Sequence, residues 1–144
     1  DIDRMLDFQY GNPAILPILQ ILYPNLDFKN STFHIDHIHP KSKFNNKNQK
    51  LSVNYQWKAN FLFNLQLLQG DENISKKAKD PEVWLDEYYQ GDIDKISAYK
   101  ERNYIDNDFE LSWEQIADFE SKRNDKFKEQ LELTFGLKKE IIDI

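Results

Sequence analysis

Three histidines and one aspartate lie within six consecutive residues, and no other stretch of the chain concentrates reactive side chains in this way. The segment Phe33-His34-Ile35-Asp36-His37-Ile38-His39-Pro40 contains every histidine of the protein. A neutral imidazole can accept a proton from water or bind a metal, and a carboxylate can bind a hard cation. The cluster therefore predicts acid–base chemistry, a metal site, or both.

Alternation in this segment predicts how the reactive groups are presented. Apolar and polar residues alternate from 33 to 37, which is the period of a half-buried strand. Phe33 and Ile35 are then expected to face a core, while His34 and Asp36 face outward together. His37 is expected where the strand ends.

Two further polar blocks follow, and each adjoins a short apolar run. Asn64-Leu65-Gln66-Leu67-Leu68 predicts a second strand, and Gly70-Asp71 is a break from which a helix carrying Asn73, Lys76 and Lys77 can start. A hairpin packed on a helix would let Asp36 and Asn73 converge on one cation, with His37 pointing at a water beside it. Asn73 has an alternative reading as the cap of that helix.

A site with oxygen ligands and few protein contacts suits Mg²⁺, which keeps several waters and completes its shell with substrate phosphate. The metal would stabilise charge on the leaving oxygen, and His37 would take the proton from the attacking water. This chemistry is phosphodiester hydrolysis. A different site, in which His34, Asp36, His37 and His39 hold zinc, is less compatible with a tetrahedron because the ligands are so close in sequence.

These blocks resemble the HNH endonucleases, also called ββα-metal or His-Me finger nucleases, in Asp36-His37-Ile38-x-Pro40-x-Ser42, Asn64 and Asn73-x-x-Lys76. The resemblance implies Asp36 and Asn73 as metal ligands, His37 as general base, and Asn64 as the residue that steadies the loop holding the base. It also implies that Lys76 lies near DNA phosphate. Asparagine in place of the last histidine favours Mg²⁺ or Mn²⁺ over softer ions.

The segment 33–77 more closely resembles the C-terminal nuclease domain of GmrSD-type, modification-dependent restriction enzymes, in which Asn-Leu-x-Leu-Leu precedes the last asparagine. The resemblance implies an α+β fold, mainly helical, in which a ββα-metal core at about 33–79 is flanked by helices. We expect residues 1–144 to form one such domain, the C-terminal part of a longer protein with an N-terminal ParB-like, nucleotide-hydrolysing domain. The implied role is DNA cleavage in phage defence.

Charge is unevenly distributed along the chain. The net charge is −6, yet residues 36–79 contain eight lysines and three acidic residues, a net charge of +5. A basic region beside a metal favours binding to a phosphate backbone. Lys41, Lys76, Lys77 and His39 are the expected contacts with DNA, with RNA as an alternative, while His34 is either a further contact or an ordinary exposed residue.

Composition narrows the remaining possibilities. The chain has no cysteine, which fits a reducing cytoplasm, and its longest apolar segment, 13–24, is too short to span a membrane. One nuclease site cuts one strand, so double-strand cleavage would require a dimer. The alternative function is a DNA-binding or interaction module that derives from a nuclease but has no turnover.

The flanking sequence predicts helices that begin at particular caps and pack around the motif. Asn12 and Pro13 predict the start of one helix, Asp80 and Pro81 another, and Ser112 to Gln115 a capping box that opens the longest helix, which Gly136 ends. Lys43 to Gln49 is expected to be a loop, and Ser52 the start of a helix through Phe61. In the longest helix the predicted buried positions are Ile116, Phe119, Phe127, Leu131 and Phe135.

Overall fold

The computed structural model describes residues 1–45 and 55–137. Two strands, β1 (Phe33–His37) and β2 (Leu65–Gln69), form one antiparallel sheet in the described part of the chain. The helices are α1 (Ile2–Leu6), α2 (Ile15–Leu22), α3 (Gly70–Lys76), α4 (Pro81–Tyr88), α5 (Ile93–Arg102) and α6 (Ile116–Thr134). Short 3₁₀ helices, η1 (Lys41–Phe44), η3 (Lys58–Asn60), η4 (Leu62–Asn64) and η5 (Trp113–Gln115), connect them. The α+β class expected from the sequence is therefore present, and helices predominate.

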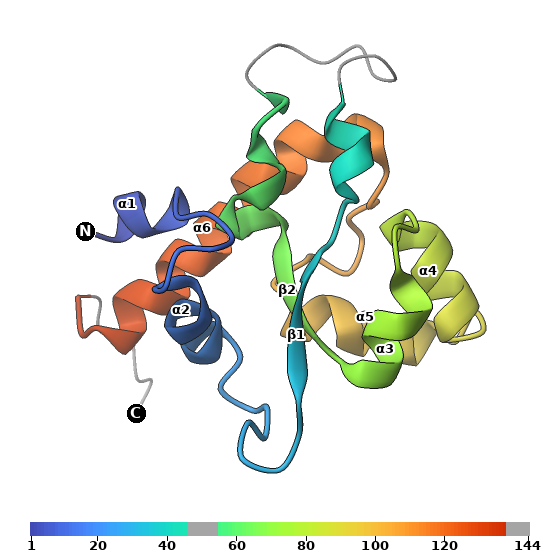
Figure 1. The fold of residues 1–144 in the computed structure, drawn as a ribbon, viewed down its shortest axis with the longest axis horizontal. Helices are drawn as coiled ribbons and strands as arrows, with labels where there is room; N and C mark the ends of the chain where they lie inside the picture. Colours follow the sequence, from blue (N-terminus) through green and yellow to red (C-terminus); the bar gives the residue numbers. More distant parts are fainter. Residues whose placement is uncertain (46–54, 138–144) are drawn as a thin grey trace, which may run out of the picture.

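The hairpin lies at the centre of the fold (Figure 1). Its register pairs Phe33 with Gln69 and His37 with Leu65. β1 has the predicted bounds, whereas β2 begins one residue later than expected because Asn64 belongs to η4. Phe33 and Ile35 are half-buried and pack on the apolar core, and His34 is exposed, as the alternation predicts, but Asp36, which is expected to face outward with His34, is largely buried against Gln66.

α3 follows β2 without a connecting loop. The Gln69 side chain accepts a hydrogen bond from the backbone of Glu72, whose carboxylate in turn accepts one from the Gln69 backbone. This reciprocal capping box starts the helix. Asn73 therefore lies inside α3, and the alternative that it caps the helix is wrong.

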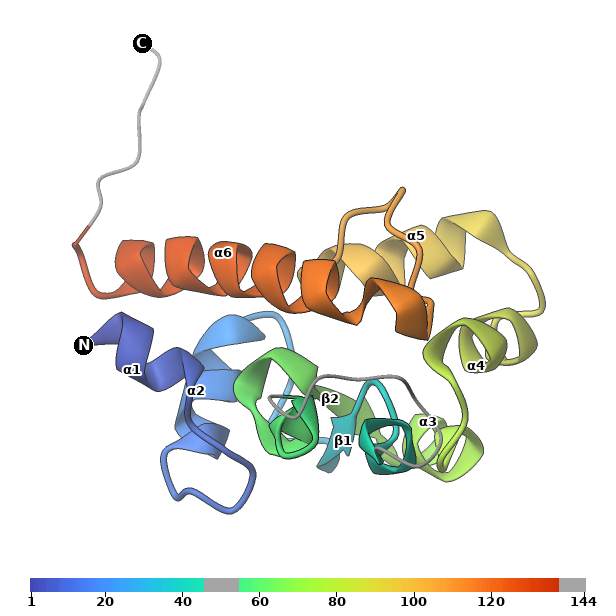
Figure 2. The same ribbon diagram turned by 90° about the horizontal axis from the view of Figure 1, so that it is seen from above.

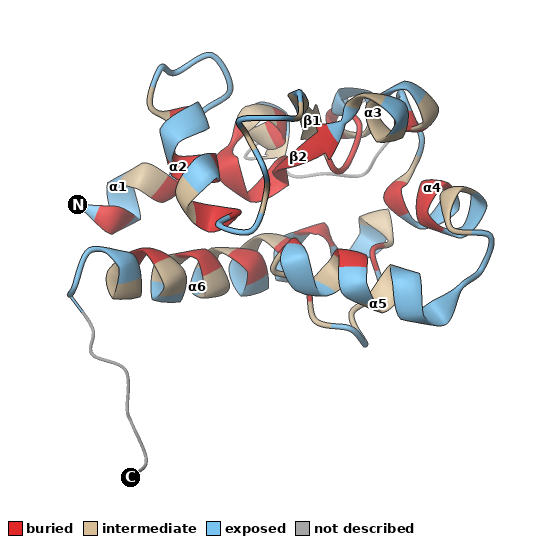
Figure 3. Ribbon diagram, turned by 90° about the horizontal axis from the view of Figure 1, so that it is seen from below, coloured by how far each residue is buried: buried red, intermediate tan, exposed pale blue. Residues whose placement is uncertain are grey.

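Helices α5 and α6 form a layer on one side of the hairpin (Figure 2). α6 turns a continuous buried stripe toward β2 and α2, as Figure 3 shows. Ile116, Phe119, Phe127 and Leu131 are buried as predicted, at the spacing that places them on one helix face. Phe135 is instead exposed because α6 ends at Thr134, and Gly136 then turns the chain with φ +71°.

The apolar core has two parts, both covered by α6. One part lies between α1, α2, β2 and the C-terminal half of α6, and it includes Leu19, Leu62, Leu65, Leu67 and Phe127. The other lies between α4, α5 and the start of α6, and it includes Ile38, Phe63, Trp84, Tyr99 and Phe119. Because the hairpin and η4 contribute to both parts, the core fixes the hairpin from two directions.

Several predicted helix starts are displaced. α2 begins at Ile15 rather than at the Asn12 cap, although the Asn12 side chain does accept a hydrogen bond from the Ala14 backbone at 2.8 Å. α6 is preceded by η5, and the Ser112 side chain caps neither helix. α4 begins at Pro81 as predicted, but the Asp80 carboxylate pairs with Lys43 at 3.5 Å instead of capping the helix.

The segment between the strands also differs from prediction where it is described. Lys43 belongs to η1 rather than to a loop, and residues 46–49 of that expected loop lie outside the described residues. The predicted start of a helix at Ser52 lies outside them too. From residue 55 onward the chain forms the short turns η3 and η4 rather than one α-helix.

No helix among the described residues is long and apolar enough to cross a membrane.

Arg123 of α6 joins the two parts of the core. Its side chain is 1% exposed. Nη1 donates hydrogen bonds to the carbonyls of Phe63 and Leu65 at 2.6 and 2.7 Å, and Nε donates to the carbonyl of Asn103 at 3.0 Å. Nη2 donates to the Tyr23 hydroxyl at 3.3 Å. One guanidinium thus connects α6 with the entry to β2, the end of α5 and the end of α2.

Replacing Arg123 with Met should lower the free energy of unfolding by about 4 kcal/mol, because three buried carbonyls lose their donor. Arg123→Lys should be intermediate, since an ammonium keeps the charge but cannot span acceptors that lie apart. Urea unfolding followed by circular dichroism measures both values. A loss below about 1 kcal/mol for Arg123→Met would contradict a structural role for this network.

Candidate active site

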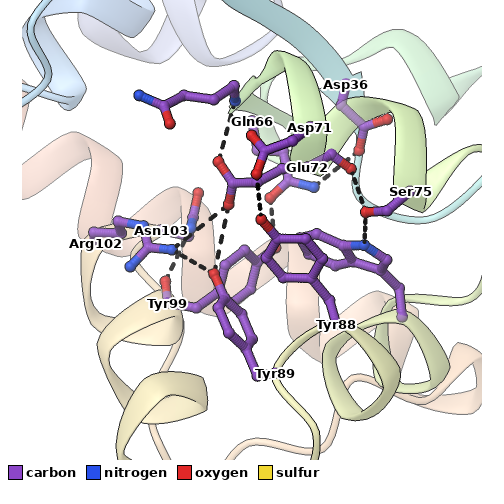
Figure 4. Close-up of polar contacts among 12 residues, drawn as sticks. Asp36, Gln66, Asp71, Glu72, Ser75, Tyr88, Tyr89, Tyr99, Arg102 and Asn103 are labelled. Carbon is purple, nitrogen blue, oxygen red and sulfur yellow. Dashed lines mark hydrogen bonds and ion pairs between the residues drawn. The ribbon is translucent and has the colours of Figure 1, made fainter.

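Asp36 is held by two donors near the end of β1. Its Oδ2 accepts hydrogen bonds from Lys76 Nζ at 3.1 Å and from Gln66 Nε2 at 2.9 Å. Gln66 is the cross-strand partner of Asp36 on β2, and its Oε1 accepts a hydrogen bond from the Tyr99 hydroxyl of α5 (Figure 4). The Asp36 side chain is 12% exposed. Both contacts use Oδ2.

Lys76 is the main correction to the sequence-based site. The resemblance predicts that Lys76 contacts DNA phosphate, but its side chain is 0% exposed. Its ammonium binds Asp36 Oδ2 and donates to the backbone carbonyl of His37 at 2.8 Å. Burial lowers the Lys76 pKa, and the Asp36 carboxylate opposes that shift. Lys76 therefore acts inside the protein, as the cation that holds α3 against the end of β1.

Asn73 lies on α3, three residues before Lys76, and is half-buried. Residues three apart occupy the same face of a helix. Asn73 therefore lies on nearly the same face of α3 as Lys76, whose ammonium contacts Asp36 of β1. Asp36 and Asn73 are thus on facing elements, with a carboxylate on the strand and an amide on the helix.

Polar contacts fix α3 on the helices that follow it (Figure 4). The Tyr88 hydroxyl of α4 donates to Asp71 at 2.8 Å, and the Trp84 indole donates to Ser75 at 2.9 Å. Glu72 pairs with Arg102 of α5 at 3.9 Å. Helices α4 and α5 therefore hold α3, the helix that carries Asn73 and Lys76, in its position.

His37 lies at the end of β1 and is half-buried. Its Nε2 is 2.8 Å from Asn60 Oδ1. Because an amide oxygen only accepts, Nε2 carries the hydrogen in this arrangement and the lone pair lies on Nδ1. Burial lowers the His37 pKa, and the contacts with Asn60 and Asp36 oppose this shift. The ring is therefore neutral at pH 7, as a general base requires.

Asn64 fixes the loop that follows His37. Its side chain is buried, with Oδ1 accepting from the His39 backbone N–H and Nδ2 donating to the carbonyls of His39 and Ala59, each at 2.9 Å. The Asn64 carbonyl also accepts from the Ile38 N–H at 2.8 Å. The Asn64 side chain therefore binds backbone groups of His39, after β1, and of Ala59, before η4. These bonds hold the loop after His37, which is the role expected of Asn64.

His39 is a second correction. The sequence predicts a contact with DNA, but His39 is 1% exposed, and its ring packs edge-on against Trp113 and Phe119 at centroid distances of 5.7 and 5.1 Å. Burial, reinforced by the charges of Lys76, Arg123 and Lys43, lowers its pKa to about 3. His39 is therefore a neutral core residue in this structure, beyond the reach of a nucleic acid.

The remaining predicted contacts are on the surface. Lys41 at the start of η1, Lys77 at the end of α3 and His34 on β1 are all exposed. Lys41 is close enough to His37 for its charge to lower the His37 pKa, although less than burial does. Lys41 therefore adds positive charge beside His37, and Lys77 is exposed at the end of α3.

The zinc alternative, which the close spacing of its ligands already disfavours, gains no support from the described residues. No group of three or more His, Cys, Asp or Glu side chains in the described part of the chain is placed to hold a metal. His34 is exposed on the strand and His39 is in the core, so the four residues do not share one point. The expected pair of Asp36 and Asn73 is a different donor set, whose two oxygens would suit Mg²⁺ or Mn²⁺ with water and substrate as further ligands.

No family model matches the chain, and no curated protein matches it.

Sequence reasoning missed two residues that position the site. Asn60 holds the His37 ring, and Gln66 holds Asp36 while connecting it to Tyr99. Gln66 could have been found, since a polar residue within the apolar run 65–68 needs a partner when the strand is buried. Asn60 gave no comparable signal, because its partner lies in a different segment.

The buried His39 predicts a stability that depends on pH. The unfolded chain binds a proton at His39 near pH 6.5, whereas the native state binds it only near pH 3. Stability should therefore fall as the pH drops through this window, by about 2 kcal/mol between pH 7 and pH 5 from this residue. His39→Phe keeps an aromatic ring, lacks the titrating group and should show a shallower dependence in urea unfolding.

The matched control is His34→Phe, because the His34 ring is exposed on β1. Its unfolding free energy should follow the wild-type pH dependence. Equal slopes for His39→Phe and the wild type would contradict the assignment of His39 as a buried neutral group.

Proposed function

We propose that this chain is a metal-dependent DNA endonuclease or nickase that hydrolyses phosphodiester bonds. The supporting observation is the arrangement around β1, β2 and α3. Asp36 and His37 end one strand, Asn64 fixes the loop after them, and α3 presents Asn73 on the face that also carries Lys76 to Asp36. Apart from Lys76, which is buried instead of facing DNA phosphate, this order of residues along the elements is the one that the resemblance to HNH nucleases predicts for a ββα-metal site.

His37 acts as the general base in this proposal. Its Nδ1 takes the proton from an attacking water, while the Asn60 oxygen holds the Nε2 hydrogen and so fixes both the tautomer and the plane of the ring. The Lys76 contact with the His37 carbonyl and the Asn64 contacts with the next turn fix the backbone. The base is therefore held at its ring and at its main chain.

Asp36 Oδ1 and the Asn73 amide oxygen are the groups that would hold Mg²⁺ or Mn²⁺. Bound there, the ion would stabilise negative charge on the phosphate and on the leaving oxygen. Lys41 and Lys77 would bind neighbouring phosphates from the surface.

The biological setting follows from the resemblance to GmrSD-type restriction enzymes. The chain would cut DNA in phage defence, within a protein that also carries an N-terminal ParB-like, nucleotide-hydrolysing domain. That domain would supply recognition of the modification. A single site nicks one strand, and pairing of two sites would give double-strand cleavage.

Metal-dependent nicking of supercoiled plasmid tests the proposal. The wild-type chain with Mg²⁺ or Mn²⁺ should convert the plasmid to the nicked form, and EDTA should abolish the conversion. His37→Ala should slow it at least about a hundredfold, because the base is lost. His34→Ala, which removes an exposed histidine from the same strand, should retain most of the activity.

Both histidine variants should keep the far-ultraviolet circular dichroism of the wild type. Cleavage by pure His37→Ala protein at the wild-type rate would refute His37 as the base. Equal losses in the two variants would show that the assay does not report on the position of His37.

A second candidate function is a binding module without turnover, and the Lys76–Asp36 pair is the observation that favours it. An ammonium 3.1 Å from Oδ2 partly neutralises the carboxylate that a metal requires. Charge on this pair would then serve folding rather than catalysis. Such a module would shift DNA in a gel and cut it with neither ion.

Mn²⁺ binding, followed by electron paramagnetic resonance of the free ion, separates the two candidates. Asn73→Asp should tighten binding about tenfold, because a carboxylate replaces a neutral ligand. Asp36→Asn should weaken it by a similar factor. Ile74→Asp is the matched control, since it adds the same charge one residue along, at a side chain that is exposed.

A nuclease site predicts that Asn73→Asp and Ile74→Asp differ. Equal affinities in these two variants would remove Asn73 from the ligand set. Wild-type protein that neither retains Mn²⁺ nor nicks plasmid would leave the binding module as the better account.

A further inference from the structure

We propose that Tyr10 is a stacking residue for an unpaired nucleobase beside His37, so that the site takes single-stranded or locally unpaired nucleic acid. This inference rests on the proposed function for its substrate class. It assigns a role to an N-terminal residue outside the segment 33–79, which contains all the other site residues. The substrate would present a base face to Tyr10 and its phosphate to the groups around His37.

The Tyr10 ring lies directly beside the candidate base. Its centroid is 5.6 Å from that of His37, and the two planes are inclined by 57°. Tyr10 is also 50% exposed, so much of its surface faces solvent although it adjoins a half-buried histidine. An aromatic surface of this kind can accept the face of a base, because every base has a π-face.

The main chain holds Tyr10 in this position. Its N–H donates to the Asn60 carbonyl at 2.8 Å, and the Leu62 N–H donates to the Phe8 carbonyl at 3.1 Å, on either side of an antiparallel bridge between Gln9 and Phe61. Asn60 therefore fixes Tyr10 through its backbone and His37 through its side chain. Asn60 therefore holds both Tyr10 and His37 and so sets the distance between their rings.

Gly11 follows with φ +96°, a conformation that L side chains rarely adopt. It turns the chain away immediately after Tyr10. The ring therefore stands at the end of the paired segment, where the backbone does not cover it.

The surroundings of Tyr10 favour a nucleotide over a protein partner. The neighbouring groups are polar or charged: His37, the Asn60 side chain and, near His37, the exposed Lys41. Protein interfaces bury many residues around an apolar centre. An exposed ring beside His37, whose pKa the charge of Lys41 lowers, brings together the two features by which proteins bind single strands, base stacking and charge.

Base pairing decides which nucleic acid can use this surface. Bases in a duplex are stacked on each other, and a base reaches a protein ring only when it leaves the stack. Tyr10 thus predicts a preference for unpaired strands over the same sequence in a duplex. That preference distinguishes stacking from contacts with phosphates alone, which a duplex also offers.

Fluorescence anisotropy tests the inference in EDTA, where cleavage does not occur. The probes are a short fluorescein-labelled single-stranded DNA of mixed sequence and its blunt-ended duplex. Wild-type protein should bind the single strand more tightly, and Tyr10→Ala should weaken that binding about tenfold while changing duplex binding much less. Tyr10→Phe should bind like the wild type, because it keeps the ring.

Phe135→Ala is the matched control, since it removes another exposed ring, near the far end of α6. It should leave both affinities unchanged. A thermal melt of each variant shows that folding is intact, as expected for a side chain that is half exposed.

Two results overturn the inference: equal affinity of wild type and Tyr10→Ala for the single strand, or tighter wild-type binding to the duplex. Plasmid nicking by the wild-type protein is scored separately. Nicking without any dependence of binding on Tyr10 would refute this inference and leave the nuclease standing. Dependence of single-strand binding on Tyr10 without nicking would do the reverse.

Discussion

The Arg123 guanidinium is the interaction on which the rest of the structure depends. A buried cation is costly unless its donors are satisfied, and among the described residues Arg123 forms no pair with a carboxylate. Its hydrogen bonds go to carbonyls and a hydroxyl, and its charge also lies 4.6 Å from the centre of the Phe127 ring. Two of those carbonyls, of Phe63 and Leu65, flank Asn64. Asn64, which fixes the loop after His37, is thus held in place by Arg123 of α6. The position of the candidate base therefore depends on a long helix that contributes no side chain to the proposed chemistry.

Unlike Arg123, the buried cation Lys76 is paired with a carboxylate, Asp36, and this pair determines the charge at the candidate site. An ion pair in the interior stabilises a protein only when its geometry offsets the loss of water, and here Lys76 gains a second acceptor, the His37 carbonyl, while Asp36 gains a second donor, Gln66. The pair is therefore well satisfied. For a cation arriving at Oδ1, the same pair supplies a weaker negative potential than an isolated carboxylate would. In the proposed metal site, the substrate phosphate would therefore have to supply part of the negative charge that holds the ion.

Local pattern predicted the elements of the site better than it predicted the environment of each side chain. The bounds of β1 follow from alternation, and α3 follows from the break at Gly70, because both signals lie within a few residues. Burial of Lys76 and His39 could not be read in this way. A lysine three residues after Asn73 looks like a surface residue until the helix is placed against β1, and His39 enters the core because Asn64, which is distant in sequence, turns its backbone inward. The capping box expected at Ser112 failed for a related reason, since a 3₁₀ turn precedes α6 and takes up the residues that would have formed it.

The segment 33–79 does not form the candidate site alone. The inner face of β2 is covered by Leu19 of α2 and by Phe127 and Leu131 of α6, and these residues share one cluster with Leu65 and Leu67. Residues 8–10 pair with 60–62, so the turn that carries Asn60 is positioned by the N-terminal segment. Asn60 in turn fixes His37. A two-stranded hairpin is at best marginally stable in water without such packing. The orientation of the His37 ring therefore depends on parts of the chain outside 33–79. Helices α2 and α6 pack on β2, and the bridge between Gln9 and Phe61 positions Asn60, which binds the ring.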